Sequence, residues 1–423
     1  MASPRSLDEW LRKQETVHGQ AIDLGLARVR AVAQRLQLLP FGPRTIIVAG
    51  TNGKGSTVAW LDILLRNLGH RVGAFTSPHL LRYNERIQVA GAAASDSELI
   101  AAFNAIDSAR GDTTLTFFEY NALAALYVFR ERQVDIAVLE VGLGGRLDAV
   151  NIVDAEAAIV CSIGLDHADW LGTDIEVIGR EKAGVFRPGA IAVIADAAMT
   201  PSVEAEARQL GAHTVVAGRD YSWLPDVAGQ GQWTFRSSAV TLGGLPPLAL
   251  PGRMQLANVS AALAVLVAMQ LLDHEDFPAV AQALRRLQLA GRFQIVPGPV
   301  EWILDVAHNE PAAQMLAQNL RDRPCAGKTW CVTAILGDKD VAAVAGALAG
   351  VVHAWILCGI DAPRGLPAAE LARRSPVFSS GLQARDIVTG MHAAAASAQP
   401  GDRIVVCGSF LAVAPAMQQL GLY

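Results

Sequence analysis

The sequence predicts an α/β protein of two domains, each built on a mostly parallel, doubly wound sheet. At 423 residues the chain is longer than a single hydrophobic core usually supports. Short runs of apolar, β-branched residues alternate with longer helical patterns, which is typical of parallel sheets covered by helices. A segment rich in glycine and proline, residues 291–299, separates two series of such runs.

The first series predicts strands at residues 45–49, 71–75, 134–139, 157–161 and 190–194. Helical patterns lie between several of them, for example at 57–68 and 119–132. The stretch 221–251 is rich in Gly and Pro and has short alternating runs, so it predicts a small antiparallel excursion in the first domain.

The second series predicts strands at 300–304, 329–335, 354–357 and 403–406, again with helices between them. We therefore expect a first domain at residues 1–293, a linker at 294–299 and a Rossmann-like second domain at 300–423.

The composition excludes a disordered chain and several classes of partner. Hydrophobic residues make up 52% and charged residues 18%, as in globular proteins. The net charge of -5, without a run of Lys and Arg among aromatics, predicts no binding to nucleic acid or acidic membranes. Residues 1–15 lack a signal-peptide core, and the most apolar stretch, 261–272, is too short for a bilayer. The five scattered cysteines predict reduced thiols in a cytoplasmic protein.

The first expected strand runs into a glycine-rich loop, Gly50-Thr-Asn-Gly-Lys-Gly-Ser-Thr57, and then into a helix. Glycines let backbone N–H groups turn toward phosphate oxygens, and the helix N-terminus adds partial positive charge. Lys54 supplies a full charge for the β- and γ-phosphates. The strict P-loop pattern has Ser or Thr directly after Gly-Lys and a glycine where this chain has Val48, so the loop is a shorter variant. The loop predicts an ATP-using enzyme with a P-loop ATPase-like first domain, and a turn without a ligand is the alternative.

Polar residues follow three other strands of the first domain. Ser77 comes after 71–75, Glu140 ends 134–139, and His167 comes after 157–161. Because the carboxyl ends of parallel strands line one crevice, we expect these side chains to converge near Lys54. Oxygen donors such as Ser77 and Glu140 suit Mg²⁺, whereas His167 alone could equally be a hydrogen-bonded loop residue.

Further candidates are less specific on spacing alone. Lys182 has the spacing of a salt-bridged helix lysine. In the second domain, Asp305 and His308 end one apolar run, and residues 338–340 follow another and are candidates for holding an amine substrate. Two domains that each present polar strand ends predict an interdomain cleft, where water can be excluded from a reaction.

These residues lie in long segments that resemble a known family. They include Leu139-Glu-Val-Gly-Leu-Gly-Gly-Arg-Leu-Asp-Ala149, Leu165-Asp-His-Ala-Asp-Trp-Leu-Gly172 and Asp305-Val-Ala-His-Asn309, besides the phosphate loop. The chain resembles the Mur ligase superfamily and, within it, the bifunctional dihydrofolate synthase/folylpolyglutamate synthase family. One departure is Met254, which stands where that family commonly has a His before Gln255.

The resemblance implies roles for particular residues. The implied ATP contacts are Asn52, Gly53, Lys54, Gly55, Ser56, Asn258, Arg292 and Asp305. The implied magnesium ligands are Ser77, Glu140 and His167, and the implied catalytic residues are Lys54, Lys182 and His308. Lys182 is implied to be carbamylated. The implied dihydropteroate pocket consists of Ile22, Asp23, Leu24, Thr116, Phe117, Phe118, Glu119, Leu147, Asp148 and Ala149.

The implied activity is ATP-driven ligation of a carboxylate to an amine. Transfer of the γ-phosphoryl group gives an acyl phosphate, which the amino group of L-glutamate attacks. Dihydropteroate and folates are the implied acceptors, with Mg²⁺ as cofactor, a monovalent cation left open, and a monomer expected.

Three alternatives remain. A folylpolyglutamate synthase without the synthase activity shares most of these features. A cell-wall Mur ligase usually needs a further N-terminal domain, for which 49 residues before Gly50 are too few. A non-enzymatic nucleotide switch would need neither Lys182 nor the pair Asp305 and His308.

Overall fold

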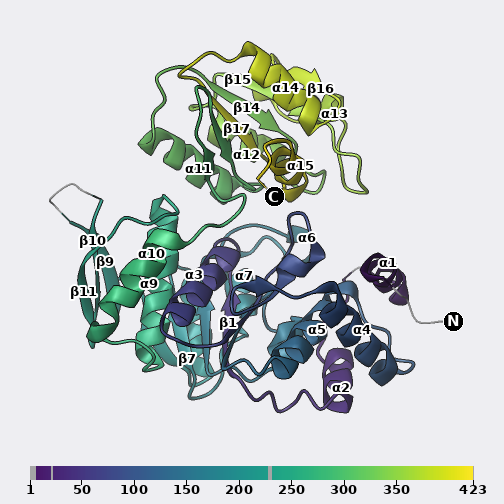
Figure 1. The fold of residues 1–423 in the computed structure, drawn as a ribbon, viewed down its shortest axis with the longest axis vertical. Helices are drawn as coiled ribbons and strands as arrows, with labels where there is room; N and C mark the ends of the chain where they lie inside the picture. The colour runs from purple at the N-terminus through teal and green to yellow at the C-terminus, as the bar shows by residue number, and fades with distance from the viewer. Residues whose placement is uncertain (1–5, 21, 227–230, 423) are drawn as a thin grey trace. The chain divides into compact units, whose positions relative to one another are not determined.

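The computed structural model describes residues 6–20, 22–226 and 231–422, and these form two compact units (Figure 1). The first unit comprises Met1–Ala249 with Gln255–Leu287, and the second comprises Leu250–Met254 with Gln288–Tyr423. Residues 1–5 of the N-terminal stretch 1–15 and residues 227–230 of the expected excursion lie outside the described residues.

The first unit is built on an eight-stranded sheet in the order β4-β3-β2-β5-β1-β6-β7-β8. Neighbouring strands from β2 to β8 pair in parallel, whereas β3 and β4 add an antiparallel edge. The strands are β1 (Arg44–Ala49), β2 (Val72–Phe75), β3 (Ile87–Val89), β4 (Ala92–Ala93), β5 (Ile136–Glu140), β6 (Ala157–Val160), β7 (Ile191–Ile194) and β8 (His213–Val216). The predicted doubly wound sheet is therefore confirmed, with strand ends that differ from prediction by one or two residues.

Helices connect these strands and cover the sheet. They are α1 (Leu7–Val17), α2 (Ala27–Arg35), α3 (Lys54–Asn67), α4 (Asp96–Arg110), α5 (Phe117–Glu131), α6 (Ala168–Leu171), α7 (Ile175–Ala183), α8 (Pro201–Gln209), α9 (Arg253–Ala268) and α10 (Phe277–Arg286). Short 3₁₀ helices lie at Tyr83–Arg86, Ala149–Ile152 and His274–Asp276.

The start of α5 is fixed by a capping box. The Thr116 hydroxyl accepts from the Glu119 N–H at 3.2 Å, and the Glu119 carboxylate accepts from the Thr116 N–H at 2.7 Å. These two bonds satisfy N–H groups that a helix start leaves without an intrahelical partner. From that start, α5 buries an apolar face that includes Leu123, Leu126 and Phe129. The cap therefore fixes where α5 begins, and with it which of its residues face the sheet.

The predicted antiparallel excursion is a three-stranded sheet in the order β11-β10-β9. Its strands are β9 (Tyr221–Pro225), β10 (Trp233–Ser237) and β11 (Thr241–Leu245), and they lie beside α9 and α10 (Figure 1). Trp233 is fully buried, and its indole N–H donates to the carbonyl of Pro246 at 2.9 Å.

The second unit has a six-stranded sheet in the order β12-β13-β17-β14-β15-β16. Its strands are β12 (Gln294–Val296), β13 (Glu301–Leu304), β14 (Thr329–Thr333), β15 (Ala354–Cys358), β16 (Leu382–Ala384) and β17 (Arg403–Cys407). Its helices are α11 (Glu310–Asp322), α12 (Val341–Leu348), α13 (Ala368–Arg373), α14 (Ile387–Ser397) and α15 (Phe410–Gln419), with a 3₁₀ helix at Pro376–Phe378. All strands except β12 pair in parallel, which confirms the second predicted sheet.

The expected linker at 294–299 needs a correction. Residues Gln294–Val296 form β12, which pairs antiparallel with β13, and the division between units falls between Leu287 and Gln288. Gly and Pro on both sides made the segment look irregular, but three residues between them suffice for an edge strand. The first three residues of the expected linker therefore belong to the second sheet.

The cysteines are present as thiols, as the sequence predicts. Four of the five cysteines are buried, and all five are free thiols. Among the described residues, no helix is long and apolar enough to cross a membrane.

Gly73 in β2 is required by the packing of α5. A Cβ atom at this position would lie 2.7 Å from the ring of Phe129. We expect Gly73→Ala to lower the free energy of unfolding by about 1–3 kcal/mol, because the overpacked ring and strand must shift. Urea unfolding followed by circular dichroism measures the change.

The matched control is Gly42→Ala, because a Cβ atom there meets open space. A second change, Phe129→Leu, should cost less in the Gly73→Ala background than in the wild type, since the smaller side chain makes room. Equal stability of Gly73→Ala and wild type would contradict this account.

Candidate active site

Ser77, Glu140, Lys54 and His167 lie at or after the carboxyl ends of β2, β5, β1 and β6, respectively. β1 pairs with β5 on one side and with β6 on the other, so the strand order reverses beside β1. Val48 lies opposite Glu140 in the register of β1 and β5. In open parallel sheets, ligands bind at this kind of switch point.

The phosphate loop has the backbone that its glycines predict. Gly50 has φ +146° and Gly53 has φ +88°, values that favour glycine, and α3 begins directly afterwards at Lys54. The Lys54 amine donates to the carbonyls of Gly50 at 2.9 Å and Thr51 at 3.0 Å. A positive group thus lies on the loop at the N-terminus of a helix, where an anion is stabilised.

A second loop, residues 161–164 after β6, is joined to the phosphate loop. The Thr51 N–H donates to the Ser162 carbonyl at 2.8 Å, and the Thr51 hydroxyl and Gly164 are linked by two further hydrogen bonds. Ser162 also bonds through its hydroxyl to both the N–H and the carbonyl of Asn52. Ser162 and Gly164 were not predicted, because their roles come from contacts with Asn52 and Thr51, 110 and 113 residues earlier in the chain.

Helix α9 brings Asn258 to the same loop. A Cβ atom at Gly53 would lie 2.8 Å from Asn258 Oδ1, so the two residues are in close contact. Gln255, one turn earlier, accepts from the Trp60 indole N–H at 3.1 Å and donates to the Ser56 hydroxyl at 3.3 Å. The contact with Ser56 makes Gln255 a further residue of the site, which the sequence did not single out.

The predicted magnesium ligands are brought together in part. Glu140 is buried, and its carboxylate accepts from the backbone N–H of Ser77 at 3.0 Å. His167 is exposed, with φ +53°, in the loop that leads into α6. The described residues contain no cluster of three or more His, Cys, Asp or Glu side chains suited to a metal. A site with one carboxylate, one hydroxyl and one imidazole fits Mg²⁺ that keeps waters and binds nucleotide phosphates.

Lys182 in α7 is buried, and its amine donates to the Gly50 carbonyl at 3.2 Å. Burial, with the charge of Lys54 second, lowers the pKa of Lys182 to about 7, although nearby carboxylates oppose this. Glycines hold its helix close to the loop after β5. A Cβ atom at Gly145 would lie 2.7 Å from the Lys182 carbonyl, and one at Gly184 would lie 2.5 Å from the side chain of Arg146.

Two of the predicted pterin-binding segments are tied to each other by Arg28 in α2. Its guanidinium lies 2.6 Å from the Asp23 carboxylate and 3.3 Å from the Glu119 carboxylate. It also donates to the Asp23 carbonyl at 2.7 Å. Arg28 was missed because arginine in a helix has no distinctive spacing.

The third pterin segment joins them through the glycine-rich loop after β5. Asp148 is buried and accepts from the N–H groups of Gly142 and Leu143 at 3.0 Å each. Burial raises the pKa of Asp148 to about 6, against the lowering effect of these bonds. A Cβ atom at Gly142 would lie 2.5 Å from the ring of Phe118. The three segments are therefore contiguous, next to Glu140.

The candidates of the second unit gather at the carboxyl end of β13. The Asp305 carboxylate accepts from the N–H groups of Phe293 and Ala307, each at 2.8 Å, and burial raises its pKa. The Arg292 guanidinium lies 5.1 Å from the ring centroid of Phe410, and the His308 ring lies 6.3 Å from the same ring. Phe410 therefore contacts two of the three predicted residues, Arg292 and His308.

The segment 338–340 follows β14, which is separated from β13 by β17 in the sheet. Asp338 pairs with Arg364 at 3.0 Å, and the Gly337 N–H donates to the Arg364 carbonyl at 2.8 Å. The loops after β14 and β15 are thereby joined, and Arg364 is a further residue that the sequence did not single out.

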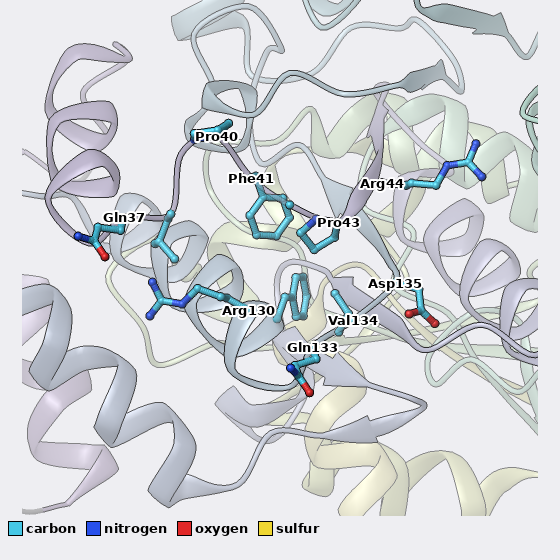
Figure 2. A pocket seen from close by; sticks show the side chains of 12 residues that line it. Gln37, Pro40, Phe41, Pro43, Arg44, Arg130, Gln133, Val134 and Asp135 are labelled. Atoms are coloured by element: carbon cyan, nitrogen blue, oxygen red, sulfur yellow. The ribbon is translucent and has the colours of Figure 1, made fainter.

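A cavity of about 390 Å³ lies at the opposite end of the first sheet (Figure 2). Its lining includes Phe41, Pro43 and Arg44, where β1 begins, and Asp135, just before β5. The phosphate loop follows the other end of β1. The cavity is therefore separate from the predicted ATP site.

Comparison with known proteins identifies the family. A model described as Mur ligase middle domain matches residues 48–266, and one described as Mur ligase, glutamate ligase domain, matches residues 291–410. The dihydrofolate synthase/folylpolyglutamate synthase of Escherichia coli is 42% identical, with 99% of this chain and 96% of that protein covered. Its counterpart in Haemophilus influenzae is 37% identical, with 96% of each covered.

Solved structures agree. E. coli FolC in complex with DHPP and ADP superposes with a TM-score of 0.94 at 40% identity, covering 100% of this chain and 99% of that one. A Yersinia pestis structure with AMPPNP and Mn ion has a TM-score of 0.92 at 42% identity, covering 100% and 99%. The fold class, the ATP-dependent ligase class and the family expected from the sequence are confirmed. The chain belongs to the dihydrofolate synthase/folylpolyglutamate synthase family of Mur ligases.

Proposed function

We propose that this chain joins L-glutamate to dihydropteroate and adds further γ-linked glutamates to folates, at the expense of ATP. The observation that carries the proposal is the arrangement of the three pterin segments. They are spread over residues 22–149, yet Arg28, Phe118 and Asp148 link them in one region beside Glu140 and the phosphate loop. An acceptor bound there has its carboxylate near the nucleotide.

The relatives support the choice of substrates. One structure with a TM-score of 0.91 and 41% identity, covering 99% of this chain and all of that one, is described with Mn, AMPPNP and L-glutamate bound. The E. coli structure is described with DHPP and ADP. By this similarity we assign ATP, a pterin acceptor and L-glutamate to the present chain.

The chemistry follows from the poor leaving group of a carboxylate. Attack of a carboxylate oxygen on the γ-phosphorus breaks its bond to the β-γ bridging oxygen and gives an acyl phosphate and ADP. The glutamate amine then attacks the acyl carbon, loses a proton, and displaces phosphate to give the amide. Bound Mg²⁺ would offset the charge of the phosphates. In our assignment, Lys54 and the loop N–H groups of Asn52 to Ser56 position that phosphate chain.

We assign Ser77, Glu140 and His167 as the Mg²⁺ ligands. Asn258 is assigned to ATP in the first unit, and Arg292 and Asp305 stay predicted ATP contacts, with His308 a predicted catalytic residue. The donor set supports Mg²⁺, because Glu140 is a buried carboxylate at the phosphate-loop end of β5.

The environment of Lys182 supports its carbamylation. A pKa of about 7 leaves a large neutral fraction near neutral pH, and only the neutral amine attacks CO₂. The product, a carbamate with release of one proton, replaces a buried cation by an anion that accepts hydrogen bonds. Its place against Gly50 would then help to organise the nucleotide and its metal.

Phosphate release tests the function. The assay contains ATP, Mg²⁺ and L-glutamate, with dihydropteroate in one arm and a reduced folate in the other. We expect acceptor-dependent release in both arms, with an amide product verified by mass spectrometry. Turnover with the reduced folate but not with dihydropteroate supports a folylpolyglutamate synthase without the synthase activity. If neither acceptor stimulates phosphate release, the proposal is contradicted.

The carbamate predicts a dependence on CO₂ and pH. After removal of CO₂, activity should fall and then recover when CO₂ is restored. Because the pKa of Lys182 is lowered to about 7, the neutral amine increases as pH rises through that value. At equal dissolved CO₂, recovery should be about tenfold faster near pH 8 than near pH 6. Loss and recovery of activity are followed by phosphate release.

Lys182→Ala is the control. It should lose turnover by about 10²-fold or more while still binding ATP, and it should not respond to CO₂. Wild-type activity that is indifferent to CO₂, or undiminished turnover of the variant, would exclude the carbamate.

A further inference from the structure

We infer that Arg28 is a positioning residue for the pterin acceptor, holding the loop at 22–24 in place against the N-terminus of α5. The inference rests on the proposed function, since it concerns how that acceptor is bound. It assigns a role to a residue outside the predicted pterin segments.

The loop needs such a tie because it has little structure of its own. Residues 22–25 form neither helix nor strand, and Ile22, Asp23 and Leu24 are only half-buried. Arg28 holds Asp23 twice, through the carboxylate at 2.6 Å and through the carbonyl at 2.7 Å. A bond to the main chain fixes the path of the backbone, which a bond between side chains alone does not.

The other partner of Arg28 is rigid. Glu119 is buried, with its side chain 4% exposed, and one carboxylate oxygen is occupied by the capping box at the start of α5. The other oxygen faces Arg28 at 3.3 Å but makes no hydrogen bond. The guanidinium therefore connects a segment without helix or strand to a fixed helix end by charge.

The positive charge of Arg28 offsets the repulsion between Asp23 and Glu119. Asp23 and Glu119 are both carboxylates, and without Arg28 their like charges would push the loop away from α5. His18 Nε2 also lies 3.4 Å from the Asp23 carboxylate. Arg28 lies between the two acidic groups and offsets both.

The geometry also separates pterin binding from nucleotide binding. The phosphate loop is held by residues 162–164 and by α9, through contacts in which Arg28 takes no part. Loss of Arg28 should therefore weaken acceptor binding and leave ATP binding nearly unchanged. A merely structural arginine would affect both, through the stability of the unit.

The test uses the full chain and compares Arg28→Met, Arg28→Lys and Arg35→Met. Arg35 lies on the same helix and bonds to the carbonyls of Ala109 and Arg110, so its variant controls for loss of a helix arginine. For each variant, KM for dihydropteroate, KM for ATP and kcat are measured by phosphate release, and Tm is measured by thermal unfolding.

We expect Arg28→Met to raise KM for dihydropteroate about tenfold or more, with KM for ATP within about twofold of wild type. Arg28→Lys keeps the charge but not the paired donors, so its KM for dihydropteroate should lie between that of the wild type and that of Arg28→Met. Arg35→Met should match wild type in both KM values. If Arg28→Met does not fold, Arg28→Lys carries the same test at an unchanged Tm.

An unchanged KM for dihydropteroate in both Arg28 variants would overturn the inference while leaving the proposed function intact. A parallel rise of both KM values, together with a lower Tm, would also overturn it, because it marks a structural role. A wild-type chain that neither binds nor turns over dihydropteroate would contradict the proposed function and this inference together.

Discussion

The site of this ligase depends on the hydrogen bonds between the phosphate loop and the loop after β6. Thr51 and Asn52 are bonded to Ser162 and Gly164 through both backbone and hydroxyl groups. These bonds join the ends of β1 and β6, the two strands between which the strand order reverses. They fix the loop before any ligand arrives, so little conformational entropy remains to be lost on binding phosphate. Lys54, Lys182 and Asn258 are then all placed against a rigid backbone.

Charge is distributed unevenly around that backbone. Lys54 and Lys182 both donate to the Gly50 carbonyl, and their mutual repulsion adds to burial in lowering the pKa of Lys182. Glu140 and Asp148 lie on the other side of β1, after β5. Asp148 offsets its burial mainly through backbone N–H groups, and the charge of Lys54 adds a smaller effect. In the proposed binding mode, the cations would lie near the phosphates and the oxygen donors near the metal, as phosphoryl transfer requires.

Much of the fold and part of the site follow from local sequence. The strands around Val48, Val138 and Val405 can be recognised as apolar runs. The glycines at 50 and 53 predict the phosphate loop, because few other residues adopt such φ values. Ser162, Gln255 and Arg28 could not be predicted, because their roles come from contacts with residues 90 to 200 positions away or from a loop without periodicity. β12 was mistaken for a linker, since an edge strand of three residues leaves too short a pattern to recognise.

The close packing of Gly145 and Gly184 against the helix of Lys182 has a consequence for how such enzymes can vary. At both positions a single methyl group would meet backbone or Cβ atoms rather than a flexible side-chain end. The short distance from α7 to the loop after β5 is therefore possible only because these two residues lack a side chain. If either gained a Cβ atom, no change of rotamer could relieve the clash. A change to alanine at either glycine adds only one methyl group, yet it would move an amine whose pKa depends on its burial. Lineages that retain this chemistry should accept almost any change on the exposed side of α7 and almost none at these two glycines.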